Sequence, residues 1–189
     1  MNNQYKIALC KAIEVLESEK FEKVLNAIQE CRDRKCNIFL IGNGGSASLA
    51  DHFATDWSKG IFEKTQNQCK AISLASNTSL ITALSNDFSY DQIFAKQLSY
   101  LANQKDLLFS ISGSGNSRNI LEGIREAKSL GMDTVGISGF GGGQLAREVQ
   151  HAIVVDSYDM QIVEDTFSAI GHAIFKALSG TEVKVENHL

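Results

Sequence analysis

The sequence contains no proline, and none of its apolar runs approaches the ~20 residues needed to cross a bilayer. Without proline the commonest marker of kinks and linkers is missing, and no low-complexity stretch or repeat array takes its place. The N-terminus is polar and runs directly into a helical pattern, unlike a secretory signal peptide. These absences favour one globular domain over a membrane-spanning or multidomain protein.

Cysteine is scarce, and cations are slightly outnumbered by anions. The four cysteines form no C-x-x-C pair, and they are Cys10, Cys31, Cys36 and Cys69. Without an export signal we expect free buried thiols and a cytoplasmic protein. The 18 Lys and Arg against 22 Asp and Glu give a net charge of −4, which argues against a nucleic-acid surface. An anionic ligand would therefore be held by local dipoles and hydroxyls rather than by a basic field.

With 189 residues, 43% of them hydrophobic, the chain is long enough for one domain with a sizeable core. Short apolar segments alternate with helical patterns from residue 36 onward. Strands are expected at residues 37–41, 70–74, 106–111, 133–137 and 152–155. Helices are expected at residues 46–59, 91–101, 117–130 and 162–178, with shorter segments at 77–85 and 142–148.

Nearly continuous apolar strands that alternate with helices predict a parallel sheet covered on both faces. The predicted fold class is therefore α/β, with a five-stranded parallel sheet flanked by helices. Two additional helices are expected before it, because apolar residues recur at helical spacing in the first 35 residues. We expect one domain over residues 1–189, with an N-terminal helical pair (1–35), an α/β core (36–180) and a C-terminal tail (181–189).

Two stretches rich in glycine and serine follow two of the predicted strands. One reads Gly-Asn-Gly-Gly-Ser at residues 42–46, and the other reads Ser-Gly-Ser-Gly-Asn-Ser at residues 112–117. Each supplies backbone N–H groups and small side chains at the start of a helix, where a phosphate binds readily. Ligands of parallel sheets bind at the carboxyl ends of strands. The two loops therefore predict a site for a phosphorylated small molecule.

Neither loop has the spacing of a nucleotide-binding motif. The G-x-x-x-x-G-K-[ST] pattern is absent, and the first loop does not match G-x-G-x-x-G. For one such loop alone, a flexible turn with Ser117 as a helix N-cap would be the plainer interpretation. Two loops at equivalent positions favour phosphate binding. Arg118 and Lys59 are the nearby cations, and Arg118 suits an exposed position as well as it suits a phosphate.

Histidines and carboxylates form a second candidate site. His52 and Asp56 are four residues apart in the predicted helix at 46–59, so their side chains share one face. Such a pair serves as metal ligands, as an acid/base pair, or merely as a surface hydrogen bond. The last helix carries Glu164 and His172, and all four side chains are ligands that a divalent ion such as zinc accepts.

One geometric difficulty affects this set of four. Eight residues of helix rise about 12 Å, so Glu164 and His172 do not easily meet at one ion from regular helical positions. Either Glu164 lies outside the regular helix, or the two side chains act at different places in the site.

Taken together, these motifs resemble those of the sugar isomerase (SIS) family, and within it the phosphoheptose isomerases. The resemblance covers nearly the whole chain and rests on the loops at 42–47 and 114–117, on Asp-His-Phe-Ala at 51–54, and on Thr-Ala at 82–83 with Asn-Asp at 86–87. It implies conversion of sedoheptulose 7-phosphate to D-glycero-D-manno-heptose 7-phosphate for lipopolysaccharide or capsule. It also implies a homotetramer with active sites at subunit interfaces.

The family's functional residues map onto matching positions of this chain. The predicted substrate contacts are Asn43, Gly44, Gly45, Ser46, Asn86, Asp87, Ser112, Gly113, Ser114 and Ser117. The zinc ligands correspond to His52, Asp56, Glu164 and His172. The chain departs from the family, which usually has glutamate at position 56, glutamine at 164 and arginine at 60, and commonly threonine at 113.

Aldose–ketose isomerisation moves a proton between adjacent carbons through an enediolate, which requires a base, an acid and stabilisation of the developing oxyanion. We expect a carboxylate base, Asp56 or Glu164, and His172 as the acid. The resemblance implies a base at position 56, where Asp56 is one methylene shorter than glutamate, so Glu164 is the alternative.

The rival hypotheses are a non-catalytic SIS module that binds a phosphosugar or a protein, and an isomerase of another phosphosugar. Neither nucleic acid nor membrane is an expected partner.

Overall fold

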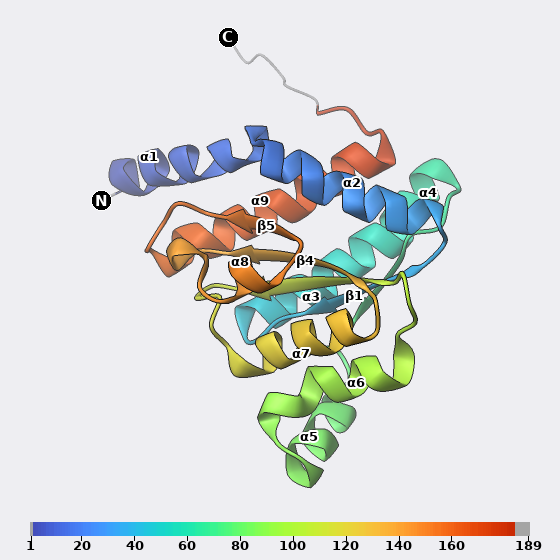
Figure 1. Cartoon of the computed structure of the whole chain (residues 1–189). Helices are drawn as coiled ribbons and strands as arrows, with labels where there is room; N and C mark the ends of the chain where they lie inside the picture. The colour runs from blue at the N-terminus through green and yellow to red at the C-terminus, as the bar shows by residue number, and fades with distance from the viewer. Residues whose placement is uncertain (1, 184–189) are drawn as a thin grey trace.

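The computed structural model describes residues 2–183, and its centre is one parallel sheet (Figure 1). The five strands are β1 (Asn37–Ile41), β2 (Lys70–Ser73), β3 (Leu107–Ser112), β4 (Asp133–Ser138) and β5 (His151–Val154). They are ordered β2-β1-β3-β4-β5, and every pairing is parallel. The predicted five-stranded parallel sheet is therefore confirmed. Of the predicted C-terminal tail, residues 184–189 lie outside the described residues.

Helices follow the strands as predicted, with one exception. They are α1 (Asn2–Ile13), α2 (Glu19–Asp33), α3 (Gly45–Thr55), α4 (Ile61–Thr65), α5 (Thr78–Asp87), α6 (Ile93–Leu101), α7 (Arg118–Ser129), α8 (Leu145–Glu148) and α9 (Met160–Ser179). Short helical turns are η1 (Glu14–Glu17), η2 (Asp56–Gly60), η3 (Tyr90–Gln92) and η4 (Phe140–Gly142). The exception is the single helix predicted at 46–59, because α3 is continued by the π-helical turn η2 and then by α4.

Alternate apolar residues of β1 and β3 enter different cores, as the period of two of a β-strand requires. In β1, Ile38 and Leu40 pack with residues of α2, α3 and α9 on one face of the sheet. Phe39 and Ile41 pack with residues of α6 and α7 on the other. All four side chains are buried. This two-sided burial explains why the strands read as continuous apolar runs.

The two predicted N-terminal helices are present and cover α9 and the neighbouring face of the sheet (Figure 1). Ser18 caps α2, and its side-chain oxygen accepts a hydrogen bond from the backbone N–H of Phe21. Tyr5 of α1 donates its hydroxyl to the Asp165 carboxylate of α9 at 2.6 Å. This hydrogen bond is the largest of the effects that raise the pKa of Tyr5 to about 12.

The strand order places the two glycine- and serine-rich loops at one point. From β1, one connection leads to β2 on one side and a later one brings the chain back to β3 on the other. This reversal leaves a crevice at the carboxyl ends of β1 and β3, which is the usual ligand site of such sheets. The loop at residues 42–46 follows β1, and the loop at 112–117 follows β3.

The four cysteines are free, but only two of them match the expectation of buried thiols. Cys31 and Cys69 are buried, and this burial raises the pKa of Cys31 to about 12 and that of Cys69 to about 11. Cys36 is partly buried, and Cys10 is exposed on α1. The two buried thiols therefore stay protonated and unreactive at neutral pH.

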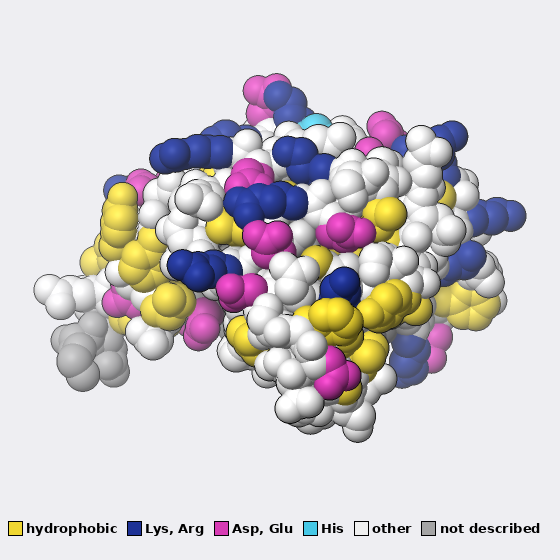
Figure 2. All heavy atoms as spheres, turned by 60° about the horizontal axis from the view of Figure 1, so that its bottom comes forward, with side chains coloured by type: hydrophobic (Ala, Val, Ile, Leu, Met, Phe, Trp, Pro, Cys, Tyr) yellow, Lys and Arg dark blue, Asp and Glu magenta, His cyan; other side chains and the backbone are white. Residues whose placement is uncertain are grey.

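Charged side chains of both signs are interspersed on the face that Figure 2 brings forward, with hydrophobic side chains gathered toward its lower half. No broad basic field is visible there, in keeping with the net charge of −4. Among residues 2–183, no helix has the length and apolar character needed to span a bilayer.

Candidate active site

The loops after β1 and β3 form the walls of one cavity of about 160 Å³. This cavity, called the phosphate pocket below, is lined by Asn43, Ser46, Ile111, Ser112, Gly113, Ser114, Ser117, Met160 and Glu164. The lining includes residues at the N-terminal ends of α3, α7 and α9. The N-terminal ends of α3 and α7 carry a partial positive charge and suit an anion, whereas the Asp159 side chain caps α9 by accepting from the N–H groups of Gln161 and Ile162.

The serine hydroxyls of the phosphate pocket keep their protons available for a ligand. The oxygens of Ser112 and Ser114 accept hydrogen bonds from the backbone N–H groups of Gly115 and Asn116, each at 3.2 Å. Ser117 is the N-cap residue of α7, but its side chain makes no capping hydrogen bond. The predicted use of the Ser117 hydroxyl as a cap is therefore not found. All three hydroxyls can donate to phosphate oxygens.

Two residues that the sequence reasoning missed hold the first loop in place. Asn119, which is buried in the first turn of α7, exchanges amide hydrogen bonds with Asn43 at 2.7 and 2.8 Å. Tyr90 of η3 also donates its hydroxyl to the Asn43 side-chain oxygen, at 2.9 Å. For Asn119 the sequence did contain a signal: it is a lone asparagine two residues after Ser117, at the start of an otherwise apolar helix face, where a buried amide needs a hydrogen-bond partner.

The second loop is braced by the glycine-rich segment that follows β4. The backbone N–H of Gly139 donates to the Gly113 carbonyl, and that of Leu145 donates to the Gly115 carbonyl, both at 2.9 Å. Gly115 has a φ of +66°, and a Cβ at this position would collide with the Gly142 carbonyl. Only glycine fits there, and these contacts hold the second loop against the segment after β4.

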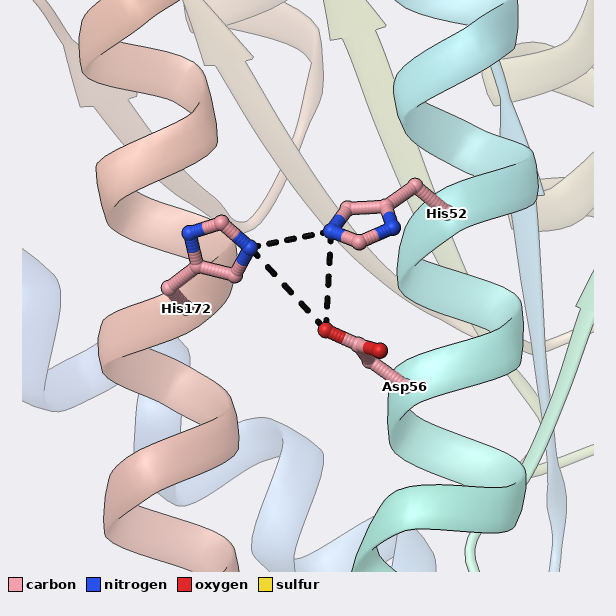
Figure 3. A group of neighbouring side chains, drawn as sticks. All are labelled: His52, Asp56 and His172. Atoms are coloured by element: carbon pink, nitrogen blue, oxygen red, sulfur yellow. Dashed lines mark hydrogen bonds and ion pairs between the residues drawn. The ribbon is translucent and has the colours of Figure 1, made fainter.

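A group of three titratable side chains lies further along α3 and α9 (Figure 3). The Nε2 atoms of His52 and His172 are 2.9 Å apart, and the Asp56 Oδ2 atom lies 3.5 Å from the first and 3.9 Å from the second. The side chains are 46%, 54% and 33% exposed for His52, His172 and Asp56 respectively. Three of the four predicted side chains, His52, Asp56 and His172, therefore meet as one His–Asp–His group.

The spacing of these three atoms fits a zinc ion. Ligands about 2.0–2.1 Å from a tetrahedral zinc lie about 3.3 Å from one another. The three observed separations of 2.9, 3.5 and 3.9 Å lie on both sides of that value. Imidazole nitrogen and carboxylate oxygen are also donors that zinc prefers. His52, Asp56 and His172 can therefore hold the ion with little movement.

Glu164, the fourth predicted ligand, is not part of this group in the described chain. It lies inside the regular helix α9, eight residues before His172, which is a rise of about 12 Å. Its carboxylate lies over Gly45 in the phosphate pocket, where Oε1 is 2.8 Å from the position that a Cβ would take. The two side chains therefore act at different places, as one of the two alternatives stated above requires.

Other residues that the sequence analysis singled out lie outside the pocket lining. Asn86 and Asp87 are at the end of α5, where the Asn86 amide donates to the Asp87 carboxylate at 3.0 Å. The side chain of Arg118 is 84% exposed and lies 3.9 Å from Asp91, and that of Lys59 is 71% exposed. Within residues 2–183, the pocket lining contains no lysine or arginine.

Two of the positions that depart from the family have explanations in local packing. A Cβ at Gly113 would lie 2.7 Å from the sulfur of Met160, so the thioether fills the space that a threonine would need. A Cβ at Gly60 would lie 2.8 Å from Cε2 of Phe175. An arginine at position 60 would require that ring to move.

A parallel sheet with an anion pocket at its switch point and a His–Asp–His group beside it defines an α/β enzyme of the phosphosugar-binding class. The chain belongs to the SIS domain family, whose sequence model matches residues 3–139. The phosphoheptose isomerase of Helicobacter pylori strain P12 is 36% identical over 170 residues, which are 90% of this chain and 88% of that protein. The resemblance that the motifs indicated is confirmed.

Further relatives agree in sequence and in structure. A probable phosphoheptose isomerase of Thermoplasma acidophilum is 38% identical over 159 residues, covering 84% of this chain and 87% of that protein. The structure of a phosphoheptose isomerase from Francisella tularensis has a TM-score of 0.87 at 27% identity, covering 95% of this chain and 96% of that chain. The likeness therefore extends over almost the whole fold.

Proposed function

We propose that this chain is an aldose–ketose isomerase that converts sedoheptulose 7-phosphate to D-glycero-D-manno-heptose 7-phosphate. The relatives named above are phosphoheptose isomerases, and they match about nine-tenths of the chain. The observation that carries the proposal is the proximity of the Asp56 carboxylate and the His172 imidazole, 3.9 Å apart on neighbouring helices. The product would serve lipopolysaccharide or capsule synthesis.

The phosphate group of the substrate binds in the phosphate pocket. The hydroxyls of Ser112, Ser114 and Ser117 and the N-terminal ends of α3 and α7 supply donors and partial positive charge. This arrangement compensates for the missing cations, because an anion at a helix N-terminus needs no lysine or arginine beside it. Glu164 and Asn43 line the same pocket and contact the sugar hydroxyls.

Asp56 is the better candidate for the catalytic base. Base and acid act on neighbouring atoms of the substrate, so they have to lie within a few ångströms of one another. Asp56 meets this condition with His172, whereas Glu164 is about 12 Å from His172 along α9. Asp56 turns Oδ2 toward both histidines, which leaves Oδ1 to take the proton.

The reaction is a transfer of one proton between carbons. Asp56 takes a proton from C1 of the open-chain ketose, the electron pair of that bond forms a C1–C2 double bond, and the C2 carbonyl oxygen gains a proton from His172. Asp56 then returns a proton to C2 while His172, which has given up its own proton, takes the proton of the C1 hydroxyl, giving the aldehyde. The proton count is unchanged at the end of the cycle.

Zinc is the alternative that we propose for the same three side chains: held by His52, Asp56 and His172, the metal would stabilise the developing oxyanion in place of the His172 proton. Bound there, zinc would polarise substrate oxygens and stabilise the charge of the enediolate. An imidazole that ligates through Nε2 has no proton at that atom, so His172 is either a ligand or an acid at that nitrogen. A chelator separates these roles. If the chelator abolishes activity and added zinc restores it, His172 is a zinc ligand. If the chelator leaves activity unchanged, His172 is the acid.

A homotetramer with active sites at subunit interfaces is the assembly that we propose. The side chains of the His–Asp–His group are 33% to 54% exposed in a single chain, whereas an enediolate needs protection from water. Large apolar side chains are also exposed on several helices and turns, among them Ile7, Phe88, Tyr100 and Tyr158. Sedimentation at several concentrations tests the assembly, and a monomer at all of them would contradict it.

The experiment that tests the proposed function is a turnover assay with sedoheptulose 7-phosphate and a panel of pentose and hexose phosphates. We expect turnover of the heptose phosphate above all others. Asp56→Asn should abolish it, whereas Glu164→Gln, which installs the residue usual in the family, should retain at least a tenth of it. The reverse result would make Glu164 the base. Tight binding without turnover of any sugar would favour a non-catalytic module.

A further inference from the structure

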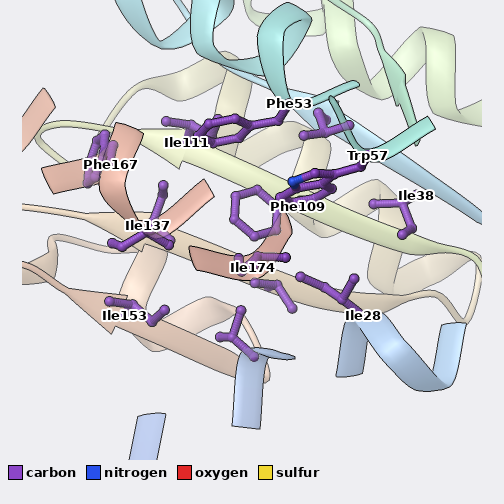
Figure 4. Close-up of a cluster of buried hydrophobic side chains, with 14 of the residues drawn as sticks. Ile28, Ile38, Phe53, Trp57, Phe109, Ile111, Ile137, Ile153, Phe167 and Ile174 are labelled. Atoms are coloured by element: carbon purple, nitrogen blue, oxygen red, sulfur yellow. The ribbon is translucent and has the colours of Figure 1, made fainter. Parts of the chain in front are cut away.

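The helices that carry the His–Asp–His group lie unusually close together at two glycines. Gly171, which precedes His172 in α9, receives the ring of Phe53, which follows His52 in α3, and a Cβ at Gly171 would overlap this ring. Trp57 stacks on Phe53 and donates its indole N–H to the Gly171 carbonyl at 3.2 Å (Figure 4). The backbones approach closely next to the histidine pair because one of them has no side chain there.

The second close approach is the reverse of the first. Here the glycine is on the α3 side, at Gly60 in η2, and the ring is on the α9 side, at Phe175. A Cβ at Gly60 would lie 2.8 Å from Cε2 of that ring, closer than such atoms come in proteins. Phe175 is three residues after His172 and therefore lies on nearly the same face of α9.

Asp56 is tied to this second contact through the backbone. It is the first residue of the π-helical turn η2, and its carbonyl accepts a hydrogen bond from the Ile61 N–H, five residues on. A π-turn is a poorer hydrogen-bonding arrangement than an α-turn and persists where packing holds it. The Phe175 ring against Gly60, at the end of the same turn, is packing of this kind.

We propose that Gly60 and Phe175 are a matched pair of positioning residues. The Phe175 ring holds the η2 turn against α9 and so fixes the Asp56 carboxylate at the two histidines. This inference rests on the proposed function only for its consequence in catalysis, because the position of Asp56 is measurable without substrate. It also accounts for glycine at position 60, where the Cβ of any larger residue would collide with the Phe175 ring.

The test compares the full-length wild type with Gly60→Ala, Phe175→Leu and the double variant. Zinc affinity is measured by competition with a chromophoric chelator, and cobalt absorption spectra report the ligand geometry. Changes next to a metal ligand typically cost ~10–100-fold in affinity. We expect Gly60→Ala to weaken zinc binding about tenfold or more, and the double variant, in which the smaller Leu makes room for the methyl group, to bind zinc as Phe175→Leu does.

Gly123→Ala is the matched control. Gly123 is a buried helical glycine on the other face of the sheet, where a Cβ would lie 3.0 Å from Cδ1 of Ile41. This variant should bind zinc as the wild type does. Wild-type affinity in Gly60→Ala would overturn the proposal. If Gly60→Ala does not fold, the double variant decides, and a zinc affinity well below that of Phe175→Leu would also overturn it.

A readout without metal or substrate keeps this inference separate from the proposed function. The imidazole signals of His52 and His172 in ¹⁵N NMR spectra of the metal-free protein should shift in Gly60→Ala, and in the double variant they should match those of Phe175→Leu. Unshifted signals would overturn the positioning role, even in an active enzyme. Shifts of this pattern in a protein without isomerase activity would support the pair and refute the proposed function.

Discussion

The phosphate pocket and the His–Asp–His group lie about two helical turns apart along the same pair of helices, and they are made of different chemical groups. The hydrogen-bond donors of the pocket are backbone N–H groups and serine hydroxyls, which do not titrate near neutral pH, and the Glu164 carboxylate also lines it. The loops are braced by Asn119 and the segment after β4. The group consists of three titratable side chains, each at least one-third exposed. A rigid pocket of neutral donors suits the phosphate, which takes no part in the reaction, whereas proton transfer between carbons needs side chains that gain and lose protons.

The comparison predicts that substitutions in the two regions have different kinetic effects. The largest effect is expected from His172→Gln, which should lower kcat by roughly a thousandfold, because a positioned acid or base contributes about 10²–10⁴-fold. Binding of sedoheptulose 7-phosphate, measured by calorimetry, should change little. His151→Gln is the control, since His151 lies in β5 away from both regions. If His172→Gln bound sedoheptulose 7-phosphate more weakly and kept its kcat, the His–Asp–His group would be a binding region, contrary to this comparison.

A moderate effect is expected from Ser117→Ala in the phosphate pocket. One hydrogen bond to a charged group contributes about 1.5–3 kcal/mol, so KM should rise about tenfold or more. The value of kcat at saturating substrate should stay within about twofold of the wild type, because the His–Asp–His group is intact. Ser129→Ala, at the other end of α7, is the matched control. Loss of kcat without a rise in KM would contradict the assignment.

The smallest effect is expected from Tyr90→Phe. This change removes one hydrogen bond to Asn43, whereas the two amide bonds between Asn43 and Asn119 remain. KM should therefore rise only about two- to threefold, the equivalent of about 0.5 kcal/mol. Steady-state kinetics beside Tyr100→Phe, a change at an exposed tyrosine, measure the difference. A tenfold or larger rise would show that the Tyr90 hydroxyl itself contacts the substrate.

The sequence predicted the phosphate pocket better than the details of the His–Asp–His group. Glycines and serines after apolar strands are local signals, and a parallel sheet brings strand ends together whatever the rest of the chain does. Asn119 and Tyr90 were missed because their roles depend on contacts across 76 and 47 residues of sequence. Such contacts follow from tertiary packing and leave no periodic pattern.

The complete His–Asp–His group could not be predicted from the sequence, because it depends on how α3 packs against α9. The spacing of His52 and Asp56 indicated one half of it, but which residues of α9 come nearest was open. The glycines at 60 and 171 decide that point, because they set where the two helices approach. The π-turn at Asp56 was not predicted either, since the local sequence suits a continuous α-helix and tertiary contacts override that preference.

The central claim is that the phosphate pocket binds the substrate and the His–Asp–His group carries out its isomerisation. An isotope experiment in D₂O tests this claim most directly. The wild type, Ser117→Ala and His172→Gln are each incubated with saturating sedoheptulose 7-phosphate in D₂O and followed by ¹H NMR. We expect aldose product with the wild type and with Ser117→Ala, with deuterium at C2 to the extent that the proton held by Asp56 exchanges with D₂O before its return. We expect neither product nor deuterium with His172→Gln despite bound substrate. Product formation by His172→Gln at the wild-type rate would contradict this division of roles.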